Sequence, residues 1–204
     1  MSAIKESFII VVNIYENGKC VYETPEMDLF TMEGLKELNE CLQTARVEFE
    51  DASLDLICVN SSRLELVAYI DALWETKYEH DMSDSEFLEI LYEEFKGYYR
   101  YPESGSLNMG ALLALASIPN VLSIKEAFDL INDGDYYMIK EWEGAKSLTA
   151  IGEEIAQEEG IYYDLEENNI LEFFDFSKYA HRELKRYVHI AGYGYYKFEY
   201  DLLQ

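Results

Sequence analysis

Basic residues are scarce in this sequence. Its 204 residues include 16 Lys and Arg against 41 Asp and Glu, which gives a formal net charge of −25 at pH 7. Proteins hold the phosphates of nucleic acids through Lys and Arg, so direct binding to DNA or RNA is not expected. The same deficit excludes binding to an anionic membrane surface.

Long apolar runs and cysteine pairs are also missing. The most apolar stretch, residues 107–118, falls short of the roughly 18 residues that indicate a membrane helix. Residues 1–7 contain no basic region followed by a long apolar run, so no secretion signal is predicted. The cysteines are odd in number, scattered and without a CxxC pair, which is typical of a reduced intracellular protein. They are Cys20, Cys41 and Cys58.

Catalytic and metal-binding motifs are absent as well. The sequence has no GxxxxGK[ST] loop, no GxGxxG after a strand, no GxSxG elbow and no HExxH. The histidines lack partners at zinc-ligand spacing, and the three aspartates near residue 133 lack the twelve-residue calcium pattern. These residues are His80, His181, His189, Asp129, Asp133 and Asp135. We therefore predict no enzyme, no metal and no cofactor.

Enough apolar residues are present for packed cores, because hydrophobic residues make up 49% of the chain and include 18 Tyr and 10 Phe. The predicted fold class is α+β, with three small units. Residues 1–61 form a strand-helix-strand unit, residues 62–134 a mainly helical unit, and residues 135–204 a unit of short antiparallel strands plus helices.

Local signals define the first unit. Strands are expected at residues 8–15 and 20–22, joined by Asn17-Gly18, which is the strongest short hairpin signal. Thr31 is expected to cap a helix that ends near Ala45, and residues 54–59 form another strand. The apolar side of this helix is expected to be buried, through Met32, Leu35, Leu38 and Leu42.

The other two units are punctuated by helix caps and turns. Capping boxes at Ser62, Ser83 and Ser123 predict helices in the middle unit, and residues 107–116 predict a buried one. In the last unit, residues 136–140 predict a strand and an acidic helix ends at Gly160. Strands at residues 187–190 and 195–200 are expected to pair through a glycine turn.

Glutamates gather on one side of several predicted helices, and residues 141–172 alone hold ten carboxylates and one cation, Lys146. Ordinary helix faces alternate Lys with Glu, whereas these faces place Glu beside Glu, which is locally unfavourable. Such a surface is either simply solvated or suited to a basic partner, and 25 net charges match roughly 40 Å of duplex DNA. The candidate phosphate-mimicking residues are Glu33, Glu37, Glu40, Glu86, Glu89, Glu93, Glu153, Glu154, Glu158, Glu159, Glu166 and Glu167.

Four cations, Lys178, Arg182, Lys185 and Arg186, lie within nine positions. They are either favourable charges near a helix C-terminus or the contact between two subunits, where a basic patch meets an acidic one.

Several segments resemble ArdA-type antirestriction proteins. Residues 173–184, FFDFSKYAHREL, resemble that family's aromatic-Asp-Tyr…Tyr/Phe-Gly-Arg-Asp-Leu segment. Residues 151–160, IGEEIAQEEG, resemble its A…YIEETG stretch, residues 123–127 its S-I-E-E-L helix start, and residues 8–23 its opening hairpin. The chain departs from the family where Ala180-His181-Arg182-Glu183 replaces Gly-Arg-Asp, and it is longer in the middle third.

The resemblance implies an elongated, curved chain of three small units that pairs into a homodimer and mimics bent B-form DNA. It implies that the protein occupies the DNA groove of a type I restriction-modification enzyme, at its methyltransferase core, without catalysis. Proteins of that family act in the bacterial cytoplasm and are carried by conjugative elements and phages.

Three alternatives stay open on the sequence. The same acidic surface would suit another defence nuclease, such as a CRISPR effector. A hydrolase with a carboxylate pair is a second alternative, because 41 acids supply such pairs trivially. A plain interaction module with an acidic coat is the third.

Overall fold

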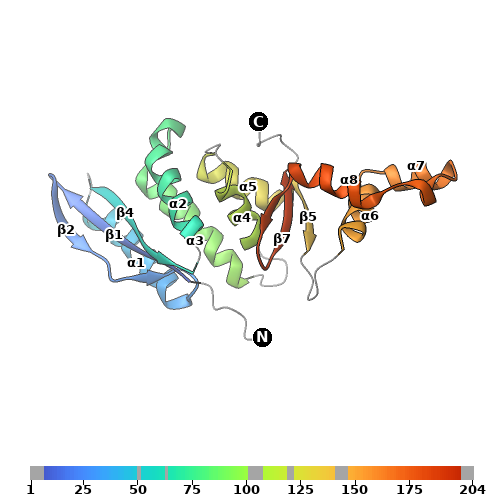
Figure 1. Ribbon diagram of the computed structural model, residues 1–204. Coiled ribbons are helices and arrows are strands. Elements are labelled where there is room, and N and C mark those ends of the chain that lie inside the picture. The colour runs from blue at the N-terminus through green and yellow to red at the C-terminus, as the bar shows by residue number, and fades with distance from the viewer. Residues whose placement is uncertain are drawn as a thin grey trace. The chain divides into compact units, whose positions relative to one another are not determined.

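The computed structural model describes residues 7–49, 52–62, 64–100, 108–118, 122–140 and 147–198 (Figure 1). The chain divides into two compact units, Met1–Asp133 and Gly134–Gln204. Each unit combines one antiparallel sheet with helices, so the predicted α+β class is confirmed. The expected boundary after residue 134 falls at this division, whereas the expected boundary after residue 61 lies inside the first unit.

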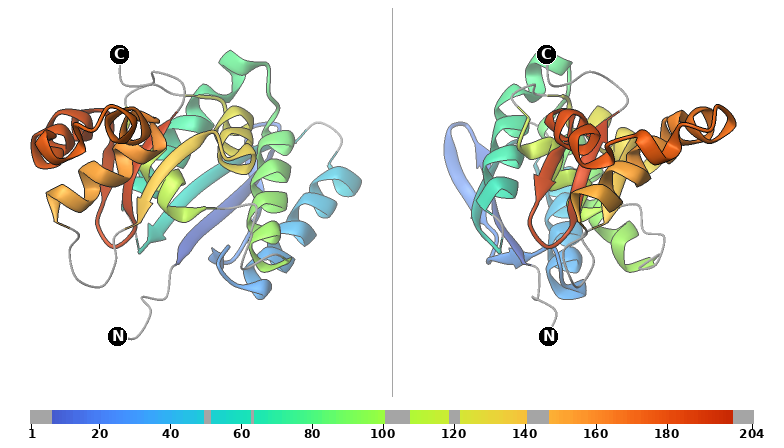
Figure 2. Two further views of the ribbon diagram at one scale, coloured as in Figure 1. Left: turned by 90° about the vertical axis from the view of Figure 1, so that its right-hand side faces the viewer. Right: turned by 45° about the vertical axis from the view of Figure 1, so that its right-hand side comes forward.

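Strand β1 (Phe8–Glu16) is the centre of the first sheet. Strand β4 (Ser53–Ser61) pairs along one edge of β1, and β2 (Lys19–Glu23) and β3 (Met27–Asp28) share the other edge (Figure 2). The turn between β1 and β2 has positive φ at both Asn17 (52°) and Gly18 (74°), as a two-residue hairpin turn requires. The predicted hairpin is therefore confirmed.

Alternate side chains of β1 form the core side of this sheet. Those of Phe8, Ile10, Val12 and Ile14 are fully buried. The ring of Phe8 stacks on that of Phe95 in helix α3 (Asp84–Arg100), with centroids 5.7 Å apart. The face of β1 that carries these four side chains is thus fully buried, and helices of the unit cover it; on the other face Asn13 is also buried.

Helix α1 (Met32–Glu48) begins at Thr31, whose Oγ1 accepts a hydrogen bond from the Gly34 amide at 3.1 Å. Leu35, Leu38 and Leu42 are buried as expected. The prediction for Met32 is wrong, because its side chain is 61% exposed. Met32 lies about 110° around the helix from the centre of the buried stripe, at 100° per residue, so it borders the acidic side.

Four further helices complete the first unit. They are α2 (Leu64–Thr76), the 3-10 helix η1 (Lys77–His80), α4 (Met109–Ala116) and α5 (Ile124–Asp133). The apolar α4 is buried from Met109 to Leu115, as predicted, and residue 107 lies outside the described residues. The capping box at Ser123 is complete, because Ser123 and Glu126 each accept a hydrogen bond from the other's backbone amide. At Ser83 the hydroxyl accepts from the Glu86 amide, and at Ser62 it accepts from the Ser7 amide.

A buried ion pair joins α2, η1 and α3. The Nζ atom of Lys77 lies 3.2 Å from Oδ1 of Asp84, and their side chains are 6% and 12% exposed. The same ammonium lies 3.8 Å from the ring centroid of Trp74. The other oxygen of Asp84 accepts the Leu54 amide at 3.0 Å, so one carboxylate fastens β4, η1 and α3 together. Tyr78 also donates to Asp84, which raises the pKa of Tyr78 to about 12.

The second unit has a three-stranded sheet in the order β5-β7-β6. Its strands are β5 (Tyr136–Lys140), β6 (Val188–Ile190) and β7 (Gly194–Phe198), as the sequence predicts. Its helices are α6 (Leu148–Glu158), α7 (Ile161–Glu167), η2 (Leu171–Phe173), α8 (Phe176–Glu183) and η3 (Leu184–Arg186). Gly160, with φ of 77°, separates α6 from α7, where the sequence places the helix end. Glu141, Glu143 and Lys146 of the acidic stretch lie outside the described residues.

Helices α6 and α8 pack side by side (Figure 2), and Gly152 is the reason they can approach so closely. A Cβ atom at Gly152 would overlap the backbone carbonyl of Phe176. Around this contact lies a core that includes Ile151, Ile155 and Tyr179. A glycine is therefore required here by the packing distance between the two backbones.

Replacing Gly152 should weaken this unit. Gly152→Ala is expected to lower the free energy of unfolding by about 2–4 kcal/mol, because the methyl group meets rigid backbone rather than a side chain that can move. Gln157→Ala, on the exposed side of the same helix, should change it by less than about 0.5 kcal/mol. Urea denaturation followed by circular dichroism measures both; equal stability of the two variants would contradict the close approach.

Removing the carboxylate of Asp84 should destabilise the first unit. Asp84→Ala leaves the Lys77 ammonium buried without its counter-ion, and the expected loss is about 3 kcal/mol. Glu86→Ala, two residues along the same helix and exposed, is the matched control and should cost less than about 0.5 kcal/mol. Thermal and urea unfolding of the full chain check the difference, and a loss for Asp84→Ala no larger than that of the control would refute the role of the pair.

Candidate acidic binding surface

Helix α1 contributes the first group of candidate carboxylates. Glu33 and Glu40 are exposed and Glu37 is half-buried, and all three lie on the side opposite the buried leucines. Glu40 lies 3.4 Å from Lys36 one turn earlier, but both side chains are mostly exposed, so the pair contributes little. Glu33 and Glu37 form no ion pair with any residue that the structure describes.

Helix α3 contributes the second group, along an open groove between α3 and α5. Glu86, Glu89 and Glu93 line this groove, and Ile90 and Phe128 supply apolar surface. Two of the three glutamates have cationic partners: Glu89 pairs with Arg46 of α1, and Glu93 lies 2.7 Å from Lys96. The structure thus brings the three residues together, but leaves Glu86 alone without an ion pair among the described residues.

Two further carboxylates, Glu94 and Asp129, line the same groove and were not among the candidates. Glu94 is half-buried, and this burial, reinforced by the charges of Asp129 and Glu93, raises the pKa of Glu94. The amide of Asn132 donates to both Glu94 oxygens at 3.1 and 3.2 Å and opposes that rise. No sequence signal identifies Glu94, because its position depends on the contact between α3 and α5.

Helices α6 and α7 contribute the third group. Glu153, Glu158, Glu166 and Glu167 are exposed and form no ion pair with a described residue, and Glu154 is half-buried. Their field reaches the neighbouring strand β5. Burial, together with the charges of Glu154, Glu158 and Glu159, raises the pKa of Tyr137 to about 12.

Glu159 differs from the other candidates, because it is held inside its own unit. It accepts hydrogen bonds from the Tyr179 hydroxyl and, at 2.9 Å, from Lys197, and its side chain is 25% exposed. Burial alone would raise the pKa of Glu159, but these hydrogen bonds and the charges of Lys197 and Arg186 outweigh it and lower the pKa. Glu159 therefore joins α6, α8 and β7 rather than facing a partner.

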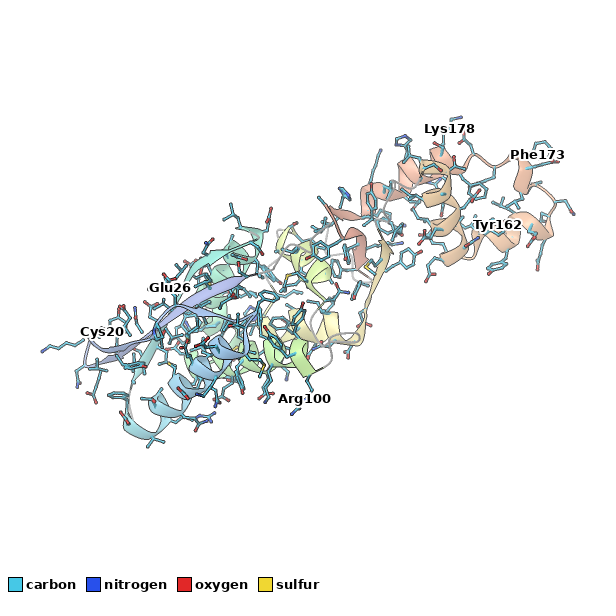
Figure 3. All side chains as sticks on the ribbon, turned by 90° about the horizontal axis from the view of Figure 1, so that it is seen from below. Cys20, Glu26, Arg100, Tyr162, Phe173 and Lys178 are labelled. Atoms are coloured by element: carbon cyan, nitrogen blue, oxygen red, sulfur yellow. The ribbon has the colours of Figure 1, made fainter. Side chains whose placement is uncertain are left out.

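A second groove lies between α6, α7 and η2. Its walls combine carboxylates with aromatic rings, and the principal ones are Glu153, Tyr162, Glu166, Glu172, Phe174 and Phe176. Beside it, Phe173 is 79% exposed. Figure 3 shows Tyr162 and Phe173 at the end of this unit that α7 and η2 form. Glu172, Phe174 and Phe176 were not among the candidate site residues.

Three of the four clustered cations have carboxylate partners within their own unit. Lys178 lies 3.1 Å from Asp175, Arg182 lies 2.7 Å from Glu183, and Arg186 lies 3.2 Å from Glu183. Glu183 is buried, so it needs these cations, and the cluster has a role inside the unit. The proposed subunit contact through Lys178, Arg182, Lys185 and Arg186 stays a prediction.

Within the described ranges, no three His, Cys, Asp or Glu side chains are placed to hold a metal ion. The ring of His189 packs on Tyr195 with centroids 4.5 Å apart. Among the described residues, no helix has both the length and the apolar composition to cross a membrane.

Comparisons with protein-family models, with curated proteins and with solved structures find no match to this chain.

Substitution of Glu159 should destabilise the protein, whereas substitution of its neighbour Glu158 should have little effect. Glu159→Gln is expected to lower the free energy of unfolding by about 1–2 kcal/mol at pH 7, because it removes the charge that Tyr179 and Lys197 stabilise. A lowered carboxyl pKa stabilises the fold above the unfolded-state pKa, and this contribution disappears as the pH falls through the folded-state pKa. The difference from wild type should therefore shrink on acidification.

The control for this experiment is Glu158→Gln, which is exposed, lacks an ion pair among the described residues and should cost less than about 0.5 kcal/mol. Denaturation between pH 7 and about pH 3 measures both variants. A loss in Glu159→Gln that does not change with pH would contradict the electrostatic origin.

Proposed function

We propose that the protein is a non-catalytic DNA mimic that occupies the DNA-binding groove of a type I restriction-modification enzyme. The observation that carries this proposal is the set of candidate carboxylates that lack an ion pair with any described residue. They are Glu33, Glu37, Glu86, Glu153, Glu158, Glu166 and Glu167. Carboxylates left in this state offer sites to the Lys and Arg side chains of a partner.

The energetics of such a surface favour a basic partner. Like charges at neighbouring helix positions repel one another, and none of these seven forms an ion pair with a described residue. A partner groove that normally takes phosphates would supply the missing cations and relieve the repulsion. Glutamates one helical turn apart are spaced by roughly 4.5–6 Å along the axis, against about 3.4 Å for successive phosphates of one DNA strand.

The proposal includes the finer features that the family resemblance implies. These are an elongated chain of small units, a homodimer, and the methyltransferase core as the partner in the cytoplasm of a bacterial host. The interaction is distributed over many weak pairs, so no single carboxylate is critical. Association is steered by charge and weakens with salt.

The hydrolase alternative needs a carboxylate pair in a deep pocket with raised pKa values. Among the described residues, Glu94 is the one carboxylate whose pKa is raised, and it lies in an open groove with an Asn132 amide as its hydrogen-bond partner. This arrangement favours binding over hydrolysis. Another defence nuclease stays an alternative target for the same surface.

Neutralising these seven carboxylates together should weaken inhibition. The sevenfold Glu→Gln variant is expected to lose at least about tenfold in its ability to displace duplex DNA from a type I methyltransferase, since each lost pair contributes about 0.2–1 kcal/mol. Competition gel shifts at about 50 mM and 200 mM salt measure the loss, and wild-type displacement should itself weaken with salt.

The matched control removes the same number of charges from other exposed positions. It carries Glu→Gln at Glu16, Glu23, Glu26, Glu48, Glu65, Glu75 and Glu79. This control should lose less than about threefold, because it leaves the proposed faces intact. Equal losses in both variants would mean that net charge alone acts, and failure of the wild type to displace DNA from type I methyltransferases would refute the proposed target.

A further inference from the structure

The groove between α6, α7 and η2 has a composition that duplex DNA does not have. Aromatic rings supply part of its wall and three carboxylates surround them. A surface that only imitated phosphates would need the carboxylates alone. The rings therefore call for an explanation beyond the spacing of charge.

The rings hold one another in place. Phe174 meets Phe176 edge to face with centroids 4.9 Å apart, and Tyr162 stacks on Phe176 at 6.0 Å. Phe176 is buried, whereas Tyr162 and Phe174 are half-buried and leave part of their surface in the groove. The aromatic wall of the groove is therefore held in place by contacts between its rings, and part of the ring surface is accessible.

The carboxylates around these rings have no cationic partner in the part of the chain that the structure describes. Glu153, Glu166 and Glu172 are exposed, and none forms an ion pair with a described residue. They come from three elements, α6, α7 and η2, and converge because those elements pack around one groove. The site thus offers negative charge and aromatic surface at the same place.

We propose that this groove binds an arginine side chain from the DNA-binding face of the partner enzyme. The guanidinium group would lie against the ring surface and pair with the carboxylates of Glu153, Glu166 and Glu172. This inference rests on the proposed function for the identity of the partner, and it adds a specific recognition site to a surface that otherwise acts through its charge.

Arginine fits this groove better than the other cations. Its planar guanidinium stacks on aromatic faces and pairs with carboxylates through two parallel hydrogen bonds, whereas the lysine ammonium is a strongly hydrated point charge. Leu171, which also lines the groove, supplies apolar surface for the alkyl part of the side chain. A metal ion would gain nothing from the rings, and an anion would be repelled by the three carboxylates.

The test is an NMR titration of the full chain with N-acetylarginine amide and, separately, with N-acetyllysine amide. Arginine is expected to shift the resonances of Tyr162, Phe174 and their neighbours in a saturable way, and to bind at least about threefold more tightly than lysine. Glu166→Gln/Glu172→Gln should weaken arginine binding by about fivefold to tenfold. Glu65→Gln/Glu75→Gln removes the same charge at exposed positions that belong neither to the groove nor to the proposed binding faces, and should weaken it less than about twofold.

Three results would overturn the proposal: equal binding of arginine and lysine, equal weakening by the two variants, or shifts spread over all acidic faces. The DNA-displacement assay separates this proposal from the wider one. If the protein displaces DNA but arginine does not bind in the groove, the proposed function stands and the arginine site is refuted. If arginine binds in the groove but the protein does not displace DNA, the arginine site stands and the proposed target is refuted.

Discussion

Repulsion among carboxylates destabilises the folded state of both units, and the rest of the structure must offset it. Forty-one acids and sixteen bases cannot be balanced by ion pairs, so the cores must supply the stability. The two units accordingly depend on close apolar and aromatic packing, with Phe8 against Phe95 in one and Gly152 against the Phe176 backbone in the other. Some of the few cations pair with carboxylates that the fold buries, as at Asp84 with Lys77 and at Glu183 with Arg186.

The carboxylates of the protein are of two kinds, according to whether they have a cationic partner. Those at contacts between elements, such as Asp84, Glu159 and Glu183, have cationic partners and strengthen the fold. Those on the outer sides of α1, α3, α6 and α7 include seven that form no ion pair with a described residue and keep the charge that a basic protein would meet. The proposed function draws on the second kind, and the groove with Tyr162 and Phe174 adds aromatic surface to that charge.

Local chemistry made much of the fold predictable. The Asn17-Gly18 turn, the Thr31 cap and the Ser123 capping box depend on residues close in sequence, and they were expected, as was every strand except the two-residue β3. Met32 was misplaced because a stripe of apolar residues read at i, i+3 spacing can extend one residue past the true packing face. The site was predictable in type, as glutamate faces, but not in which glutamates are paired.

The sequence by itself determined the net charge, the elements and the helix sides on which glutamates gather, because these follow from composition and from a period of 3.6 residues. Only the tertiary structure decided that Glu159 is bound by Tyr179 and Lys197, and that Glu94 is half-buried beside α5. It alone brings Glu153, Glu166 and Glu172 to one aromatic groove. Pairing and burial depend on distances between elements that are remote in sequence. The helical period predicts the side of a helix on which a residue lies, but not these distances.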